Sequence, residues 1–170
     1  MKKHYLCKRI LKERMKTTLI LVGKTTDRHI AALTDEYVGR LQHYAPFDIV
    51  VIPELKNTKS LSETQQKQAE GVQILRQIQT GDHVVLLDEH GKQPTSVQLA
   101  AWLEKKQATA RHLVFVIGGP YGFSSDVYAR ANEQLSLSPL TFSHQMVRPI
   151  FVEQLYRAHT IIKGEPYHHE

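Results

Sequence analysis

The chain has 170 residues, 41% of them hydrophobic, which fits one domain with a buried core. Lysine and arginine outnumber aspartate and glutamate by 22 to 17, but six of the basic residues and only one acidic residue lie in the first 14 positions. The other positions carry 16 basic and 16 acidic residues, which excludes a body that attracts nucleic acid through net charge alone.

Neither a membrane protein nor a disulfide-stabilised one is predicted. No apolar stretch approaches the ~18 residues that a membrane-spanning helix needs, so no membrane partner is expected. The single cysteine, Cys7, cannot pair within the chain, and we therefore expect a cytoplasmic protein.

The basic segment 1–14 differs from the rest of the chain. It lacks the apolar core and cleavage site of a signal peptide, and Met15 directly precedes a strand-like run. We expect this leader to be disordered or not translated, with an RNA-binding arm as the alternative. Residues 15–170 are expected to form a single domain.

The domain begins with a strand, a helix and a second strand. Residues 17–22 form a short apolar run closed by Gly23, the pattern of a buried strand. Apolar residues recur at spacings of three and four over 30–44, which predicts one face of a helix. Residues 47–52 are rich in β-branched side chains and predict the second strand.

A second helix is predicted from its cap. Ser60 and Glu63 have the spacing of a capping box, and Gly81 is expected to end the helix that they open. Its apolar positions are predicted to include Ala69, Val72, Leu75 and Ile78.

A third strand and a third helix follow. Residues 83–87 predict the strand, with a tight turn at Gly91 after it. Either Thr95 or Ser96 is expected to cap the helix. The apolar residues of that helix are Leu99, Trp102 and Leu103.

Strands and helices are predicted to alternate in the last part of the chain as well. Residues 112–117 predict a fourth strand, 126–133 a short helix and 135–137 a fifth strand. An amphipathic helix is predicted from about residue 144 to 163. Pro149 lies within it, so either this helix begins near residue 147 or it kinks.

Strands that alternate with helices predict an α/β fold: a mostly parallel sheet with helices on both faces. Ligands bind beyond the carboxyl ends of such strands. Two neighbouring loops lie there: the glycine-rich 118–122, and 135–142, in which hydrophobic and small polar residues alternate. A glycine turn and a half-buried edge strand would explain each loop separately, but together the loops could form the walls of one cleft.

Two groups of polar residues are candidates for other chemistry. Glu153 and Arg157 share a helix face, which usually indicates a solvated ion pair but would be a catalytic candidate beside a cleft. His168 and His169 are adjacent on a polar tail, where neighbouring side chains point apart, so no metal is predicted.

Four stretches in order carry a resemblance to a known family: 115–122, 135–148, 153–158 and 166–170. Together they resemble the small SPOUT-family methyltransferases that modify ribosomal RNA, and the resemblance runs from about residue 15 to 170. It implies a SPOUT-type fold with a C-terminal trefoil knot, a homodimer, and S-adenosylmethionine (SAM) bound in the knot. By position, the implied SAM-binding residues are Leu87, Gly118, Leu137, Ser138, Pro139, Leu140, Thr141 and Phe142.

The resemblance also implies the substrate and the catalytic residues. The family's substrate is a pseudouridine in helix 69 of 23S rRNA, methylated at ring N3 within the assembled 70S ribosome. The positions that resemble the family's functional residues are Glu153, Arg157, Tyr167 and His168. Tyr167 and His168 are expected to hold the nucleotide and assist proton loss. Arg157, oriented by Glu153, is expected to stabilise negative charge on the base.

Two alternatives stay open at this point. One is a ribosome-binding module that keeps the fold without transferring a methyl group, and the other is a SAM enzyme that acts on a different RNA. Calorimetry with SAM separates the binding module from either enzyme, and only ribosomal substrates separate the two enzymes.

Overall fold

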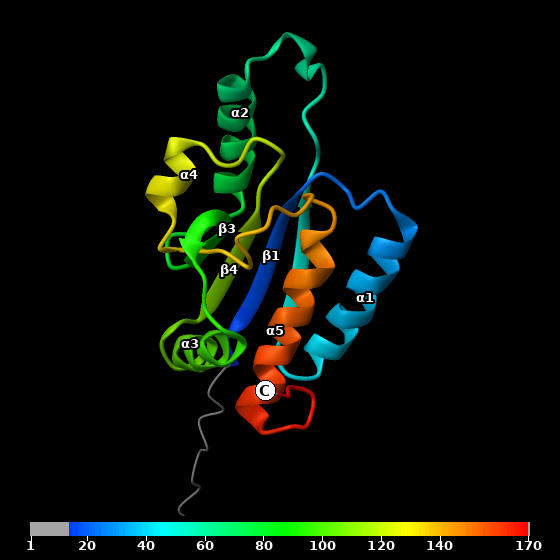
Figure 1. The fold of residues 1–170 in the computed structure, drawn as a ribbon. Helices are drawn as coiled ribbons and strands as arrows, with labels where there is room; N and C mark the ends of the chain where they lie inside the picture. Colours follow the sequence, from blue (N-terminus) through cyan, green and yellow to red (C-terminus); the bar gives the residue numbers. More distant parts are fainter. Residues whose placement is uncertain (1–13, 170) are drawn as a thin grey trace, which may run out of the picture.

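Strands and helices alternate along the computed structural model, which describes residues 14–169 (Figure 1). The strands are β1 (Lys16–Val22), β2 (Phe47–Ile52), β3 (His83–Lys92), β4 (His112–Ile117) and β5 (Glu133–Leu135). The helices are α1 (Arg28–Gln42), α2 (Glu63–Arg76), α3 (Ser96–Thr109), α4 (Ser125–Arg130) and α5 (Val147–Lys163), with a short 3-10 helix, η1 (Thr58–Ser60). The leader prediction falls almost wholly on residues 1–13, outside the described residues.

The five strands form one sheet in the order β2-β1-β4-β3-β5, and every neighbouring pair is parallel. The prediction of a mostly parallel α/β sheet is therefore confirmed. Because the strands run the same way, their carboxyl ends meet at one edge. The strand pairing does not test the trefoil knot, which stays a prediction.

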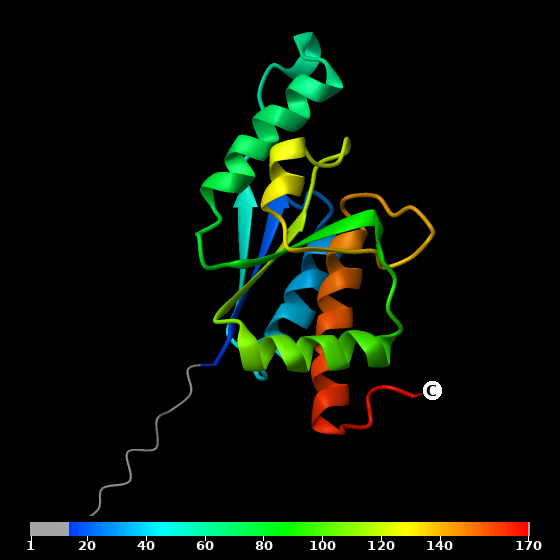
Figure 2. The ribbon, with the colours of Figure 1, turned by 90° about the vertical axis from the view of Figure 1, so that its left-hand side faces the viewer.

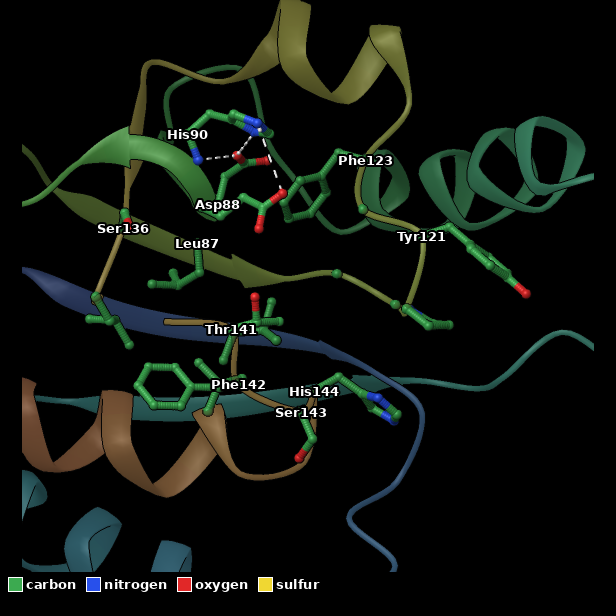
Figure 3. Close-up of a pocket in the computed structure, with 18 of the residues that line it drawn as sticks. Leu87, Asp88, His90, Tyr121, Phe123, Ser136, Thr141, Phe142, Ser143 and His144 are labelled. Atoms are coloured by element: carbon green, nitrogen blue, oxygen red, sulfur yellow. Dashed lines mark hydrogen bonds and ion pairs between the residues drawn. The ribbon is translucent and has the colours of Figure 1, made fainter. Parts of the chain in front are cut away.

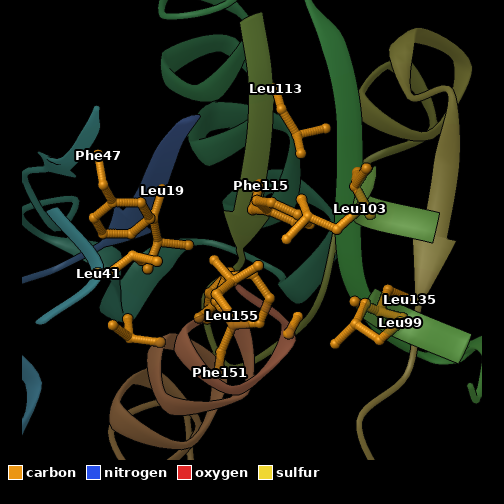
Figure 4. Packing of buried hydrophobic residues seen from close by; sticks show 14 of the residues in the cluster. Leu19, Leu41, Phe47, Leu99, Leu103, Leu113, Phe115, Leu135, Phe151 and Leu155 are labelled. Atoms are coloured by element: carbon orange, nitrogen blue, oxygen red, sulfur yellow. The ribbon is translucent and has the colours of Figure 1, made fainter. Parts of the chain in front are cut away.

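Helices cover both faces of the sheet, which explains why its central strands are continuously apolar (Figures 1 and 2). Leu19 and Phe115 point toward α1, α3 and α5, whereas Ile20 and Val116 pack with residues of α2 and α4. On the face covered by α1, α3 and α5, the ring centres of Phe115 and Phe151 lie 4.8 Å apart in an edge-to-face arrangement (Figure 4). This contact packs α5 against the sheet.

The predicted cap of α2 is wrong, but its predicted apolar face is right in part, since Leu75 and Ile78 pack against the core. Ser62 and Gln65 form the capping box, two residues after the predicted pair, and the helix ends at Arg76. Its buried residues are Glu70, Gly71 and Ile74, while Val72 is 49% exposed. The side that α2 turns toward the sheet depends on its packing against the start of α4. A Cβ on Gly71 would lie 2.3 Å from Ser124 Oγ, so only glycine fits this contact.

The turn predicted at Gly91 is also wrong, because β3 continues to Lys92. The strand bends past β5, with a shift in register between Leu87 and Lys92. A Cβ on Gly91 would lie 2.6 Å from the backbone of Gln134, so glycine permits this approach. The short helix α4 ends at Arg130 rather than Glu133, and Glu133 already belongs to β5.

Helix α5 begins at Val147, which places Pro149 in its first turn. The N–H groups of a first turn have no partner within the helix, so proline costs little there. Arg148 is fully buried beside it. Its guanidinium donates to the carbonyls of His144 and Val22 at 3.0 and 2.9 Å and to Thr25 Oγ1 at 2.8 Å. These bonds join the start of α5 to the end of β1.

Candidate active site

A cavity of about 650 Å³ opens at the carboxyl edge of the sheet (Figure 3). Its walls come from the ends of β3, β4 and β5 and from the segment that leads into α5. Seven of the eight residues predicted to bind the cofactor line it: Leu87, Gly118, Leu137, Ser138, Leu140, Thr141 and Phe142. The eighth, Pro139, is exposed and is not among the lining residues.

The glycine-rich loop forms one wall of this cavity. Gly119 and Gly122 form an isolated antiparallel bridge, and Gly122 has φ of +79°, a conformation that glycine adopts without strain. A Cβ on Gly118 would approach the Phe123 ring to 3.0 Å. The loop is thus compact and presents backbone rather than side chain to the cavity at Gly118.

An acidic residue that the prediction of site residues missed, Asp88, lies in the same wall as Leu87 (Figure 3). The Tyr128 hydroxyl donates to Asp88 Oδ2, and the His90 backbone N–H donates to Oδ1 at 2.8 Å. Burial alone would raise the Asp88 pKa, but these hydrogen bonds outweigh it and hold the pKa below its usual range. The carboxylate is therefore ionised at neutral pH.

The four residues predicted to be catalytic form a second group, which joins the middle of α5 to the C-terminal tail. Arg157 Nη2 donates to Glu153 Oε1 at 2.6 Å, and the Tyr167 hydroxyl donates to the same oxygen at 2.9 Å. The Arg157 guanidinium lies 4.8 Å from the centre of the Tyr167 ring, and its Nη1 lies 3.4 Å from His168 Nδ1. Residues from the helix and from the tail thus form one cluster.

Tyr167 is held as a hydrogen-bond donor in this cluster. Burial, the contact with the Tyr37 hydroxyl at 3.3 Å and the hydrogen bond to Glu153 all raise its pKa far above the usual range. The phenol therefore stays protonated at neutral pH and is unsuited to accept a proton.

The cluster and the cavity lie apart within one chain. Val147 lines the cavity, and Glu153 and Arg157 lie six and ten residues further along α5, roughly 9 and 15 Å away at the helical rise. Figure 1 shows that α5 runs away from segment 137–146 toward the amino ends of the strands, where the tail lies. None of the four cluster residues lines the cavity.

The described part of the chain offers neither a metal site nor a membrane-spanning helix. Within residues 14–169, no three or more His, Cys, Asp or Glu side chains gather in a way that could hold a metal ion. In the same part of the chain, no helix is both long and apolar enough to cross a membrane.

Comparison with known families identifies the class of protein that this sheet and cavity define. The family described as "Predicted SPOUT methyltransferase" matches residues 15–168. Because the match covers nearly the whole chain, the protein belongs to the SPOUT methyltransferase family.

Curated relatives narrow the assignment to one group within that family. A Bacteroides fragilis protein named ribosomal RNA large subunit methyltransferase H (RlmH) is 58% identical over 92% of this chain and 100% of its own length. Proteins of the same name from Bacteroides thetaiotaomicron and Christiangramia forsetii are 57% and 54% identical, covering 92% and 91% of this chain and 100% and 99% of their own.

Similarity to solved structures is lower. The Legionella pneumophila protein Lpg2936, solved in complex with SAM, covers 85% of this chain and 67% of its own with 12% identity and a TM-score of 0.48.

Proposed function

We propose that this protein is a cytoplasmic SAM-dependent methyltransferase that acts on N3 of a pseudouridine in helix 69 of 23S rRNA. One observation carries the proposal: residues from three distant parts of the sequence meet in one cavity, namely Leu87, Gly118 and five of the six residues 137–142. They are the positions implied by the resemblance to SPOUT enzymes. The identity with RlmH proteins over almost their full length supports the same reaction.

The cavity fits SAM in size and chemistry. Its volume lies within the range of roughly 300–1,000 Å³ that small-ligand sites have. Leu87 and Phe142 supply apolar surface, Gly118 supplies accessible backbone, and Asp88 supplies a negative charge for a cationic ligand. Bound SAM supplies an activated methyl group, so the chemistry requires no metal and no covalent enzyme intermediate.

The cluster of α5 and tail residues described above suits the activation of the nucleotide, which is the part of the reaction that SAM does not supply. A neutral ring N3 has no free lone pair for attack, so its proton must be removed or weakened. We assign Tyr167 to hold the nucleotide as a hydrogen-bond donor and His168 to assist proton loss, since a ring nitrogen of a neutral imidazole can accept a proton. Arg157 stabilises negative charge on the base, and Glu153 orients Arg157 through their 2.6 Å contact.

The separation of cluster and cavity supports a homodimer with shared sites. The reacting atoms must meet at about 3–3.5 Å, whereas Glu153 and Arg157 lie roughly 9 and 15 Å along α5 from the cavity of their own chain. A two-fold dimer that packs one chain's α5 and tail against the cavity of its partner would bring the two groups together. In such a dimer each site takes its SAM residues from one chain and its catalytic residues from the other.

The equal numbers of charges in residues 15–170 favour an assembled ribosome over free RNA as substrate. A body without net charge gains little from phosphate attraction, so ribosomal surface around helix 69 is expected to complete the binding site.

Transfer of labelled methyl from SAM to unmethylated ribosomes tests the proposed function. We expect label on the helix 69 pseudouridine of 70S ribosomes and none on free 50S subunits or naked rRNA, with the position mapped by mass spectrometry. Label on a different nucleotide would overturn the substrate assignment. Binding of SAM without any transfer would favour a ribosome-binding module.

A further inference from the structure

Residues 87–91 belong to the part of β3 that passes the cavity, and the two acidic residues among them differ sharply in environment. The Asp88 side chain is only 7% exposed, whereas the Glu89 side chain is 69% exposed. Asp88 is fixed from two sides, by the Tyr128 hydroxyl on α4 and by the backbone and ring nitrogens of His90 at 2.8 and 3.1 Å. Figure 3 shows Asp88 and His90 joined by these bonds above Leu87.

The charge of Asp88 has no permanent counter-ion in the cavity. Among the described residues that line it, none is a lysine or an arginine. His90 is the basic side chain that contacts Asp88, and it carries a charge only when it is protonated. Its side chain is 78% exposed, so solvent screens that charge. The hydrogen bonds that lower the Asp88 pKa keep it ionised. A fixed, poorly hydrated anion therefore lies in the wall of the cavity.

We propose that Asp88 is a specificity-determining residue that recognises the positive charge of the methyl donor and so distinguishes SAM from its demethylated product, S-adenosylhomocysteine. This proposal rests on the proposed function. During transfer the S–CH₃ bond breaks and a C–N bond forms to N3. The bonding pair stays on sulfur, and the N3 proton leaves to the acceptor. The sulfonium thereby becomes a neutral thioether, and the ligand loses one positive charge.

The physical consequence is a difference in affinity between substrate and product. An ionised carboxylate in a partly buried site attracts a cation over several ångströms, since solvent screens it incompletely. The attraction ends when the sulfonium becomes neutral. Asp88 would thus hold the donor and allow the spent product to leave. Glu89, one residue away, also lines the cavity, but its side chain is 69% exposed and solvent screens its charge, so it provides a matched control.

Calorimetric titration of the full chain with three ligands tests the proposal. The ligands are SAM, the neutral product S-adenosylhomocysteine, and sinefungin, in which an amine-bearing carbon replaces the methylated sulfur. We expect Asp88→Asn to weaken SAM and sinefungin about tenfold relative to the product. Glu89→Gln should change the ratio of SAM to product affinity less than twofold. Asp88→Glu, which retains the charge, should restore most of the ratio.

The outcomes separate this proposal from the proposed function. Equal weakening of all three ligands by Asp88→Asn would mean a purely structural role and overturn the proposal, as would an unchanged ratio. A wild-type chain that binds neither SAM nor its product would overturn the proposed function as well. If Asp88→Asn fails to fold, Asp88→Glu decides: loss of discrimination despite the retained charge would contradict the proposal, and retention would support it.

Discussion

The Tyr167 hydroxyl donates to Glu153 Oε1 at 2.9 Å, which joins the C-terminal tail to α5. The same oxygen accepts from Arg157. One carboxylate therefore positions two of the groups proposed to act on the nucleotide, and removing its charge should release both.

Replacement of Glu153 by glutamine tests this arrangement. Hydrogen bonds to charged groups contribute about 1.5–3 kcal/mol each, so kcat should fall at least tenfold when the carboxylate is lost. The SAM dissociation constant should stay within twofold, because Glu153 does not line the cavity. Steady-state kinetics and calorimetry measure the two quantities. Glu104→Gln at an exposed position of α3 is the control, and an equal loss in both variants would contradict the role given to Glu153.

Removal of the tail should separate binding from transfer. A chain that ends at Glu165 lacks Tyr167 and His168 but retains every residue that lines the cavity. We expect SAM to bind with unchanged affinity while methyl transfer is abolished. Calorimetry and a single-turnover assay with labelled SAM measure these effects. Parallel loss of SAM binding and transfer would show that the tail supports the cavity itself.

His159 should make the protein sensitive to acid. Burial, followed by the charge of Lys163, lowers its pKa from 6.5 to about 4. Between these pH values the unfolded chain holds a proton that the folded chain does not, so the free energy of unfolding falls as pH decreases from about 6.5 to about 4. The loss should reach on the order of 3 kcal/mol. Urea denaturation at several pH values measures it, and a His159→Gln variant with an equally steep pH dependence would refute the assignment.

Arg148 should contribute strongly to stability. Its buried guanidinium makes three hydrogen bonds that join α5 to β1 and to the loop after it. Arg148→Met leaves the carbonyls of Val22 and His144 and the Thr25 hydroxyl without these donors, and we expect the free energy of unfolding to fall by about 3 kcal/mol. Chemical denaturation measures the change. Arg28→Met on the exposed surface is the control, and a fall below about 1 kcal/mol for Arg148→Met would contradict this role.

The sequence predicts the elements best where local pattern and burial agree. Residues 47–52 and 112–117 are apolar runs between turn residues, and both strands have the predicted bounds. The buried face of α2 was predicted only in part because it depends on the contact of Gly71 with α4, which hydrophobic spacing does not contain. The turn predicted at Gly91 failed for a similar reason, since the pairing with β5 lies 40 residues away in the sequence.

The candidate site, like the fold, could be predicted from the sequence only in part. The loops beyond the strands could be predicted to meet, because parallel strands end at one edge of the sheet. Asp88 was missed because an acidic residue after a strand resembles any polar loop, and its burial depends on Tyr128 from a distant helix. Helical spacing correctly predicts that Glu153 and Arg157 lie together. Spacing alone does not show whether they act at the cavity of their own chain or at that of a dimer partner.

Mixed dimers show whether each site takes its residues from two chains. One chain carries Thr141→Trp, which fills the cavity, and the other lacks residues 166–170; both homodimers should be inactive. If each site draws on two chains, purified mixed dimers contain one intact site and should transfer methyl groups to 70S ribosomes at about half the wild-type rate. Mixed dimers no more active than the two inactive homodimers would contradict the account.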